Sequence, residues 1–140
     1  MPPDLRIAGL FEDALTTSIT GDAITSIVLR LSEPPDEAWT EAFHHEWALT
    51  SYPRKRSARV GAVRSADGTA VRRGLVVAAS LEDYVTHHRR HLEDAVLRAN
   101  DRVRQRLSTR DETLYQATRA IREINRTHYD GDAPHIRLAV

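Results

Sequence analysis

The chain has 140 residues and no cysteine, and its 20 basic residues are balanced by 20 acidic ones. This length suits one domain of ordinary size. The absence of cysteine excludes disulfides, thiolate metal sites and cysteine nucleophiles. No apolar run is long enough to span a membrane, and the first residues lack the basic and apolar segments of a signal peptide. We therefore expect a cytoplasmic protein with no membrane partner.

Charge is segregated along the chain although its sum is zero. Residues 1–50 sum to −7, whereas residues 51–80 sum to +6. Segregation of this kind can steer a charged partner. Nineteen of the 20 basic residues are arginine, so an arginine at one position is weak evidence for a bidentate anion site.

The first elements expected along the chain are two strands. Residues 14–20 and 23–31 flank the turn signal Gly21-Asp22, which predicts a hairpin. Ile27, Leu29 and Leu31 alternate along the second strand and so share one face.

A helix is expected next, from about residue 36 to Leu49. Two prolines followed by two acidic residues favour a helix start at this point. Trp39, Phe43 and Trp47 recur every four residues, so we expect all three to be buried against the sheet.

A second hairpin is predicted around Asp67-Gly68. This dipeptide is typical of a type I′ turn, in which both central residues have positive φ. Pairing outward from the turn gives one core-facing set, Ala58, Val60, Ala62, Val71, Leu75 and Val77.

Two helices are predicted over residues 81–129. Ser80 and Asp83 form a capping-box pattern, and an apolar stripe follows at positions 81, 85, 92, 95, 99, 103 and 107. A second capping box, Thr109 with Glu112, predicts a break near Ser108. We expect the two helices to pack on each other, with self-association through the same seam as the alternative.

This order predicts a single two-layer α+β domain over residues 1–140, with an antiparallel sheet of two hairpins in the order ββαββα and a C-terminal helical hairpin. Residues 130–140 are expected to form a short tail strand. A ferredoxin-like βαββαβ arrangement, ending in a strand at 135–140, is the alternative.

Histidine offers one candidate site. His87 and His91 are four residues apart on a predicted helix, a spacing that lets two imidazoles reach one metal ion. Asp83 could orient His87, and His44 or His45 would have to supply a third ligand. His88 falls on the apolar stripe, where we expect a buried, hydrogen-bonded side chain; a pH-sensitive role at a helix interface is the alternative.

The sequence contains little evidence of catalytic motifs. No serine lies in a GxSxG pattern, and the six glycines are too widely spaced for a nucleotide-binding loop. Acidic pairs occur at predicted helix starts, where stabilisation of the helix dipole is a sufficient explanation. The sequence therefore favours a protein without catalytic machinery or a cofactor.

The basic segment is the better candidate for function. It predicts a partner-binding patch that consists of Arg54, Lys55, Arg56, Arg59, Arg72 and Arg73. We expect the run at 54–56 to project into solvent. No aromatic residue occurs from Pro53 to Leu81, which argues against a sheet that stacks nucleic-acid bases.

The preferred hypothesis is a non-catalytic cytoplasmic interaction module or accessory subunit. It would bind another protein, or a second copy of itself as a dimer, through its charge-segregated surface. A metal-binding protein or metal-dependent enzyme built on His87 and His91 is the first alternative. A weak, non-specific nucleic-acid binder that uses the 54–73 basic patch is the second.

Overall fold

The computed structural model describes residues 4–130. The chain divides into two units, Met1–Val103 and Arg104–Val140, and the division falls within one helix. Unit 1 holds the sheet and the helical segments packed on it, and unit 2 begins with the remainder of that helix.

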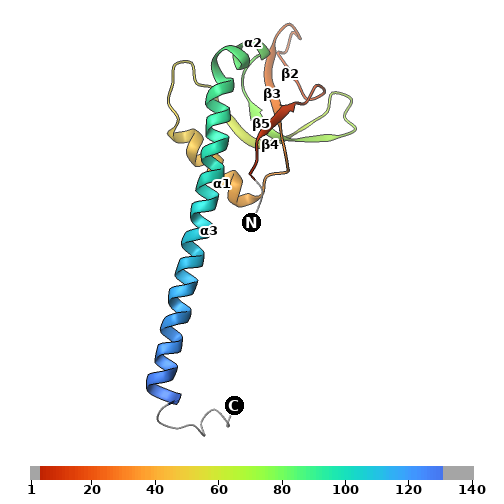
Figure 1. The fold of residues 1–140 in the computed structure, drawn as a ribbon. Coiled ribbons are helices and arrows are strands. Elements are labelled where there is room, and N and C mark those ends of the chain that lie inside the picture. Colours follow the sequence, from red (N-terminus) through yellow and green to blue (C-terminus); the bar gives the residue numbers. More distant parts are fainter. Residues whose placement is uncertain (1–3, 131–140) are drawn as a thin grey trace. The chain divides into compact units, whose positions relative to one another are not determined.

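Unit 1 is built on an antiparallel sheet (Figure 1). Its strands are β1 (Ile7–Leu10), β2 (Thr16–Thr17), β3 (Ile24–Leu31), β4 (Ala58–Arg64) and β5 (Val71–Val77). The strand order is β1-β3-β5-β4, and β2 also pairs with β3. The predicted α+β class and its two hairpins are confirmed. Strand β1 was not predicted, because its four residues show neither alternation nor a flanking turn signal.

The helical elements follow the strand pairs. They are α1 (Glu37–Leu49), α2 (Leu81–Asp83), a π turn η1 (Tyr84–His88), α3 (Arg89–Asn125) and a second π turn η2 (Arg126–Asp130). Helix α1 begins where the sequence predicts, because the Asp36 carboxylate accepts a hydrogen bond from the Trp39 amide at 2.8 Å.

The main core lies between one face of the sheet and helices α1 and α3. Trp39, Phe43 and Trp47 are all buried, as predicted. Phe43 stacks between the two indoles, with ring centroids 5.5 and 6.2 Å away. The sheet contributes Ile27, Leu29, Leu31, Leu75, Val77 and Ala58, and α3 contributes Leu92, Ala95, Val96 and Ala99.

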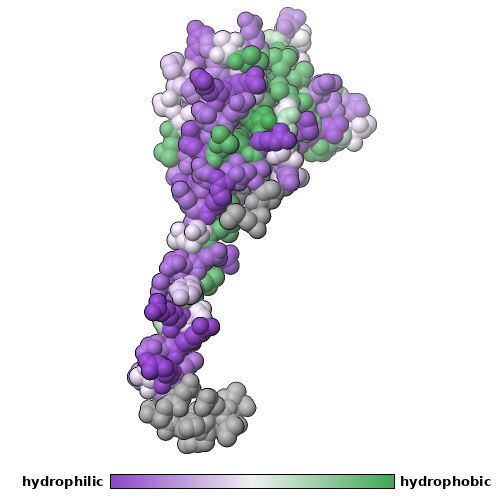
Figure 2. Space-filling view, viewed as in Figure 1, coloured by the Kyte–Doolittle hydropathy of each residue, from purple (hydrophilic) through white to green (hydrophobic). Residues whose placement is uncertain are grey.

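The opposite face of the sheet carries a smaller cluster. Val28, Val76 and Ala14 are buried there, with Phe11 and Val63 packed against them. Figure 2 shows apolar surface over the strands of unit 1.

The second hairpin has the predicted register but a different turn. Ala58 lies opposite Val77 and Val60 opposite Leu75, as expected. Gly68 has a positive φ of 75°, but Asp67 does not, so the turn is not type I′. The connection is the longer loop 65–70, which the Asp67 side chain organises.

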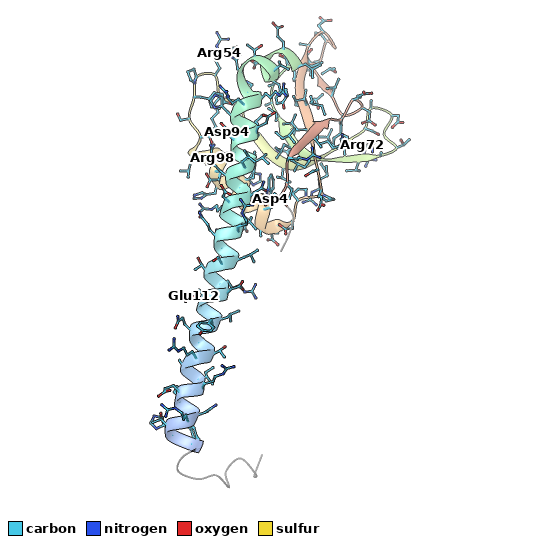
Figure 3. The ribbon with its side chains drawn as sticks, viewed as in Figure 1. Asp4, Arg54, Arg72, Asp94, Arg98 and Glu112 are labelled. Atoms are coloured by element: carbon cyan, nitrogen blue, oxygen red, sulfur yellow. The ribbon has the colours of Figure 1, made fainter. Side chains whose placement is uncertain are left out.

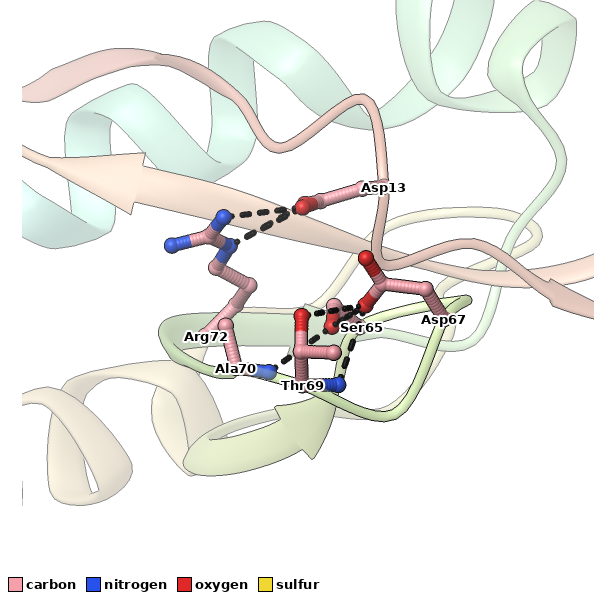
Figure 4. Close-up of polar contacts among 6 residues, drawn as sticks. All are labelled: Asp13, Ser65, Asp67, Thr69, Ala70 and Arg72. Carbon is pink, nitrogen blue, oxygen red and sulfur yellow. Dashed lines mark hydrogen bonds and ion pairs between the residues drawn. The ribbon is translucent and has the colours of Figure 1, made fainter.

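That carboxylate accepts three hydrogen bonds, two from the amide and hydroxyl of Thr69 and one from the hydroxyl of Ser65 (Figure 4). Such local side-chain bonds are the reason that aspartate favours turns. The Thr69 amide, followed by the two hydroxyls, lowers the pKa of Asp67 to about 2.

The predicted break near Ser108 is wrong, because α3 continues through it to Asn125. Residues 81–129 are therefore not a pair of helices. The Thr113 hydroxyl donates to the Thr109 carbonyl at 2.9 Å, and Glu112 accepts from Gln116 at 2.8 Å. Both are contacts within a helix. A capping box forms only where the preceding residues are not helical. No glycine or proline near Thr109 ends the helix, so the residues before it remain helical and no box forms.

The start of the helical region also differs from the predicted stripe. Leu81 and Val85 are exposed, whereas Tyr84 is buried in their place and His88 is buried as expected. The π turn explains the shift, because its i→i+5 bonds change the phase of every residue before α3.

The strand predicted over 135–140, on which the ferredoxin-like alternative depends, lies outside the described residues. Within residues 4–130, no helix is long and apolar enough to cross a membrane.

Candidate functional site

A buried polar network lies where the loop after α1 meets the π turn. The Tyr52 hydroxyl lies 2.7 Å from His88 Nδ1, and His88 Nε2 lies 3.2 Å from the Asp83 carboxylate. The His88 side chain is only 1% exposed. The prediction of a buried, hydrogen-bonded histidine is confirmed.

One tautomer of His88 satisfies both contacts. With its proton on Nε2, the imidazole donates to Asp83 and accepts from the Tyr52 hydroxyl at Nδ1. The bond to His88 lowers the pKa of Asp83, with nearby Arg56 acting in the same direction and burial opposing both. Burial, with the Asp83 charge second, raises the pKa of Tyr52 to about 12. The network connects Tyr52 through His88 to Asp83, which also lies 3.7 Å from Arg56.

Aromatic contacts enclose the same network. The His91 ring stacks on the Tyr52 ring, with 3.8 Å between their centroids. The Trp47 indole contacts the same Tyr52 ring edge-on, with 5.9 Å between centroids. These contacts anchor the loop after α1 to the first turns of α3.

The two proposed metal ligands, His87 and His91, do not converge. His91 is stacked on Tyr52, while His87 Nε2 lies 3.4 Å from an Arg54 guanidinium nitrogen. His44, the suggested third ligand, accepts a hydrogen bond from the Val60 amide instead. Among the described residues, no group of three or more histidine and acidic side chains could hold a metal ion.

A pocket of about 590 Å³ opens beside this network in unit 1. Its lining consists of Ile24, Thr25, Arg54, Arg56, Ala78, Ala79, Ser80, Glu82, Asp83, Thr86 and His87. Two guanidinium groups and two carboxylates therefore line one cavity. Both signs of charge are present, so an extended polyanion would meet the carboxylates as well as the arginines. The pocket therefore suits a ligand with one small charged group and no other charge nearby.

Two departures from regular backbone meet at this pocket. Arg54 has φ of 66°, which an arginine rarely adopts, and it is the one non-glycine residue with positive φ in the described range. His87 and Thr86 belong to the π turn. Strained backbone and π turns both occur preferentially at functional sites. The pocket beside Arg54 and His87 is therefore our candidate functional site.

The predicted basic patch is divided by the structure, and three of its members besides Arg54, which lies beside His87, have partners in their own chain. Lys55 Nζ donates to the Trp47 carbonyl at 2.6 Å and does not project into solvent as expected. Arg56 Nε lies 3.7 Å from Asp83. Arg72 pairs with Asp13 at 2.8 Å (Figure 4).

The remaining members of the patch do not share one surface. Arg59 and Arg73 are exposed, but they point to opposite faces because they lie on opposite sides of the β4–β5 pleat. Figure 3 shows Arg54 and Arg72 on different sides of unit 1. Arg54 and Arg56 come together at the pocket of about 590 Å³, and Arg56 also lines a smaller pocket with Lys55.

Sequence reasoning missed the roles of Tyr52 and Asn100. Asn100 is buried and binds both the amide and carbonyl of Leu5, and its side-chain oxygen also accepts from the Trp39 indole at 2.8 Å. A lone amide beside the apolar stripe was the available signal for Asn100. No local pattern pairs Tyr52 with a residue 36 positions later.

Comparison with protein-family models, with curated proteins and with solved structures finds no match to this chain. Its function therefore has to be inferred from the geometry around Arg54, Arg56 and His87.

Proposed function

We propose that this protein is a non-catalytic cytoplasmic interaction module, an accessory subunit that binds an acidic group of another protein through Arg54 and Arg56. The observation that carries the proposal is the meeting of these two guanidinium groups at one pocket, on a loop held in a strained backbone conformation. Arginine on a pre-positioned loop loses little freedom when it binds a carboxylate.

The histidine network supports a non-catalytic role. The Tyr52 hydroxyl is engaged with His88, and its pKa of about 12 makes it a poor base or nucleophile at neutral pH. His88 is buried and engaged at both ring nitrogens. Their contact connects the loop that carries Arg54 to the π turn.

An acidic protein surface fits the pocket better than nucleic acid does. Glu82 and Asp83 would repel a row of phosphates, since both lie in the same lining as the arginines. A single carboxylate from a partner can approach Arg54 and avoid them. Nucleic-acid affinity rests instead on several phosphate contacts at once.

The experiment is a charge reversal with a matched control. Arg54→Glu with Arg56→Glu changes the pocket, whereas Arg59→Glu with Arg73→Glu makes the same change of charge at exposed hairpin positions. The probe is a fluorescent peptide that carries a single glutamate among neutral polar residues, with binding followed by anisotropy at low and raised salt. We expect the pocket variant to bind about tenfold more weakly and the control variant to bind like the wild type.

Three results would contradict the proposal. They are absence of peptide binding by the wild type, equal losses in the two double variants, and tighter binding of a duplex DNA probe than of the peptide. Thermal unfolding of each variant checks that the fold is retained, since surface substitutions usually change stability by about 0.5 kcal/mol or less.

A further inference from the structure

A second surface lies on α3 within unit 2. Every described residue from 108 to 129 is exposed, and large apolar side chains are among them. Leu114 is 55% exposed, Ile121 58% and Ile124 50%. Figure 2 shows small apolar areas among hydrophilic side chains on the visible side of this segment.

The apolar side chains follow a heptad repeat. Successive steps of four and three residues connect Val103, Leu107, Arg110, Leu114, Ala117, Ile121, Ile124 and His128. Six of the eight positions are apolar. A 3.5-residue period of this kind generates a continuous seam for a second helix. The repeat covers about 26 residues, or about 39 Å of helix.

This segment also needs a partner for stability. Helices in water are marginal unless an apolar face is packed, because most helical stability comes from tertiary contacts. Within the described part of unit 2, nothing covers Leu114, Ile121 or Ile124. The composition of the segment is otherwise polar, so burial of this seam is the main stabilisation available to it.

We propose that the seam is covered by a second copy of this chain in an antiparallel coiled coil centred between Leu114 and Ala117. In that register Leu114 of each copy faces Ala117 of the other, and Leu107 faces Ile124. Arg110 lies over Ile121, where its aliphatic stem covers the apolar side chain while its charge reaches water.

Arg110, the charged position within the repeat, and Ala117, its smallest apolar residue, select the antiparallel orientation. A parallel pair would place Arg110 against Arg110 in one layer, which brings two like charges together. It would also place Ala117 against Ala117, leaving a gap between two small side chains. The antiparallel pair separates the arginines and matches a large residue with a small one in the central layers.

This inference goes beyond the proposed function, because it concerns a different surface from the pocket. Loss of self-association should therefore leave glutamate-peptide binding intact, and reversal of Arg54 and Arg56 should leave the dimer intact. The two proposals can fail separately.

The first test measures oligomeric state by sedimentation equilibrium on the full chain. Leu114→Glu places a charge in the seam. Tyr115→Glu is the matched control, because Tyr115 is 60% exposed, adjacent in sequence and outside the heptad positions. We expect dimers for the wild type and for Tyr115→Glu, and monomers for Leu114→Glu. A monomeric wild type, or a Leu114→Glu variant that still forms dimers, would overturn the proposal.

The second test determines orientation, and the lack of native cysteine makes it direct. Leu107→Cys and Ile124→Cys are prepared as separate single-cysteine proteins, mixed and oxidised. Facing positions across a helix pair can meet the short Cβ separation that a disulfide needs. We expect the mixed disulfide to predominate over either homodisulfide. Predominant homodisulfides would show a parallel pair and would overturn the antiparallel proposal.

Discussion

Buried polar residues connect distant parts of unit 1. His88 joins the loop after α1 to the π turn, and Asn100 joins α3 to the N-terminal segment and to α1. Each polar side-chain atom of His88 and Asn100 has at least one hydrogen-bond partner, as buried polar groups require. Removal of one partner should therefore cost more than the bond itself contributes, since a buried atom is left without a hydrogen bond.

Tyr52→Phe tests this cost. The substitution retains the ring that stacks on His91 but removes the hydroxyl that lies 2.7 Å from His88. We expect the free energy of unfolding in urea to fall by about 1–3 kcal/mol. Tyr115→Phe, at an exposed position, should change it by about 0.5 kcal/mol or less. Equal effects of the two substitutions would show that the His88 contact contributes nothing.

Turns and helix irregularities, at the scale of whole elements, determine where side chains meet. The π turn buries Tyr84 on the face where a regular helix would place Leu81 and Val85. The 65–70 loop replaces a two-residue turn with one built around the Asp67 carboxylate. In both elements one local rearrangement changes the contacts of several neighbours.

The β4–β5 turn should depend on pH through Asp67. Its pKa of about 2 lies below the ordinary 3.8, so its stabilisation is complete above the ordinary value and is lost as pH falls towards 2. We expect wild type to exceed Asp67→Asn in urea stability near neutral pH, with the gap narrowing between about pH 4 and pH 2. Thr69→Val removes one hydrogen-bond donor to Asp67, so its stability near neutral pH should fall below that of the wild type by less than that of Asp67→Asn. A gap independent of pH would contradict this account of the turn.

Charge segregation along the chain partly serves the fold of unit 1. Arg72 from the basic segment pairs with Asp13 from the acidic one, and Arg98 and Arg102 of α3 both approach Glu46 of α1. These contacts bring charges of opposite sign together from distant segments. The unequal distribution along the sequence is therefore not a measure of the charge on the surface.

Hydrogen exchange across the whole chain should separate the two units. Amides of α3 from Leu92 to Asn100 lie on the packed core and should exchange slowly at any protein concentration. Those from 108 to 125 lie in an exposed helix and should exchange faster. In a dimer their exchange should slow as protein concentration rises, while that of unit 1 stays constant. Exchange from 108 to 125 that is unaffected by concentration would contradict the coiled-coil proposal.

Much of the fold could be predicted because local patterns decide it. The spacing of Trp39, Phe43 and Trp47 identifies a buried helix face, and Asp67-Gly68 centres a hairpin whose register follows outward. The prediction of a helix break near Ser108 was wrong because local patterns do not decide that position. Thr109 with Glu112 matches a capping pattern, but a match of four residues cannot show whether the preceding chain leaves the helix.

The sequence by itself determined the α+β class, the two hairpins and the buried aromatic face of α1, because hydrophobic periodicity and turn chemistry act over a few neighbouring residues. Only the tertiary structure decided that Tyr52, Asp83 and His88 form one network. Likewise, only packing divided the basic patch and left Arg54 and Arg56 together at a pocket. These outcomes depend on the phase of the π turn and on contacts between segments more than 30 residues apart, which no local pattern encodes.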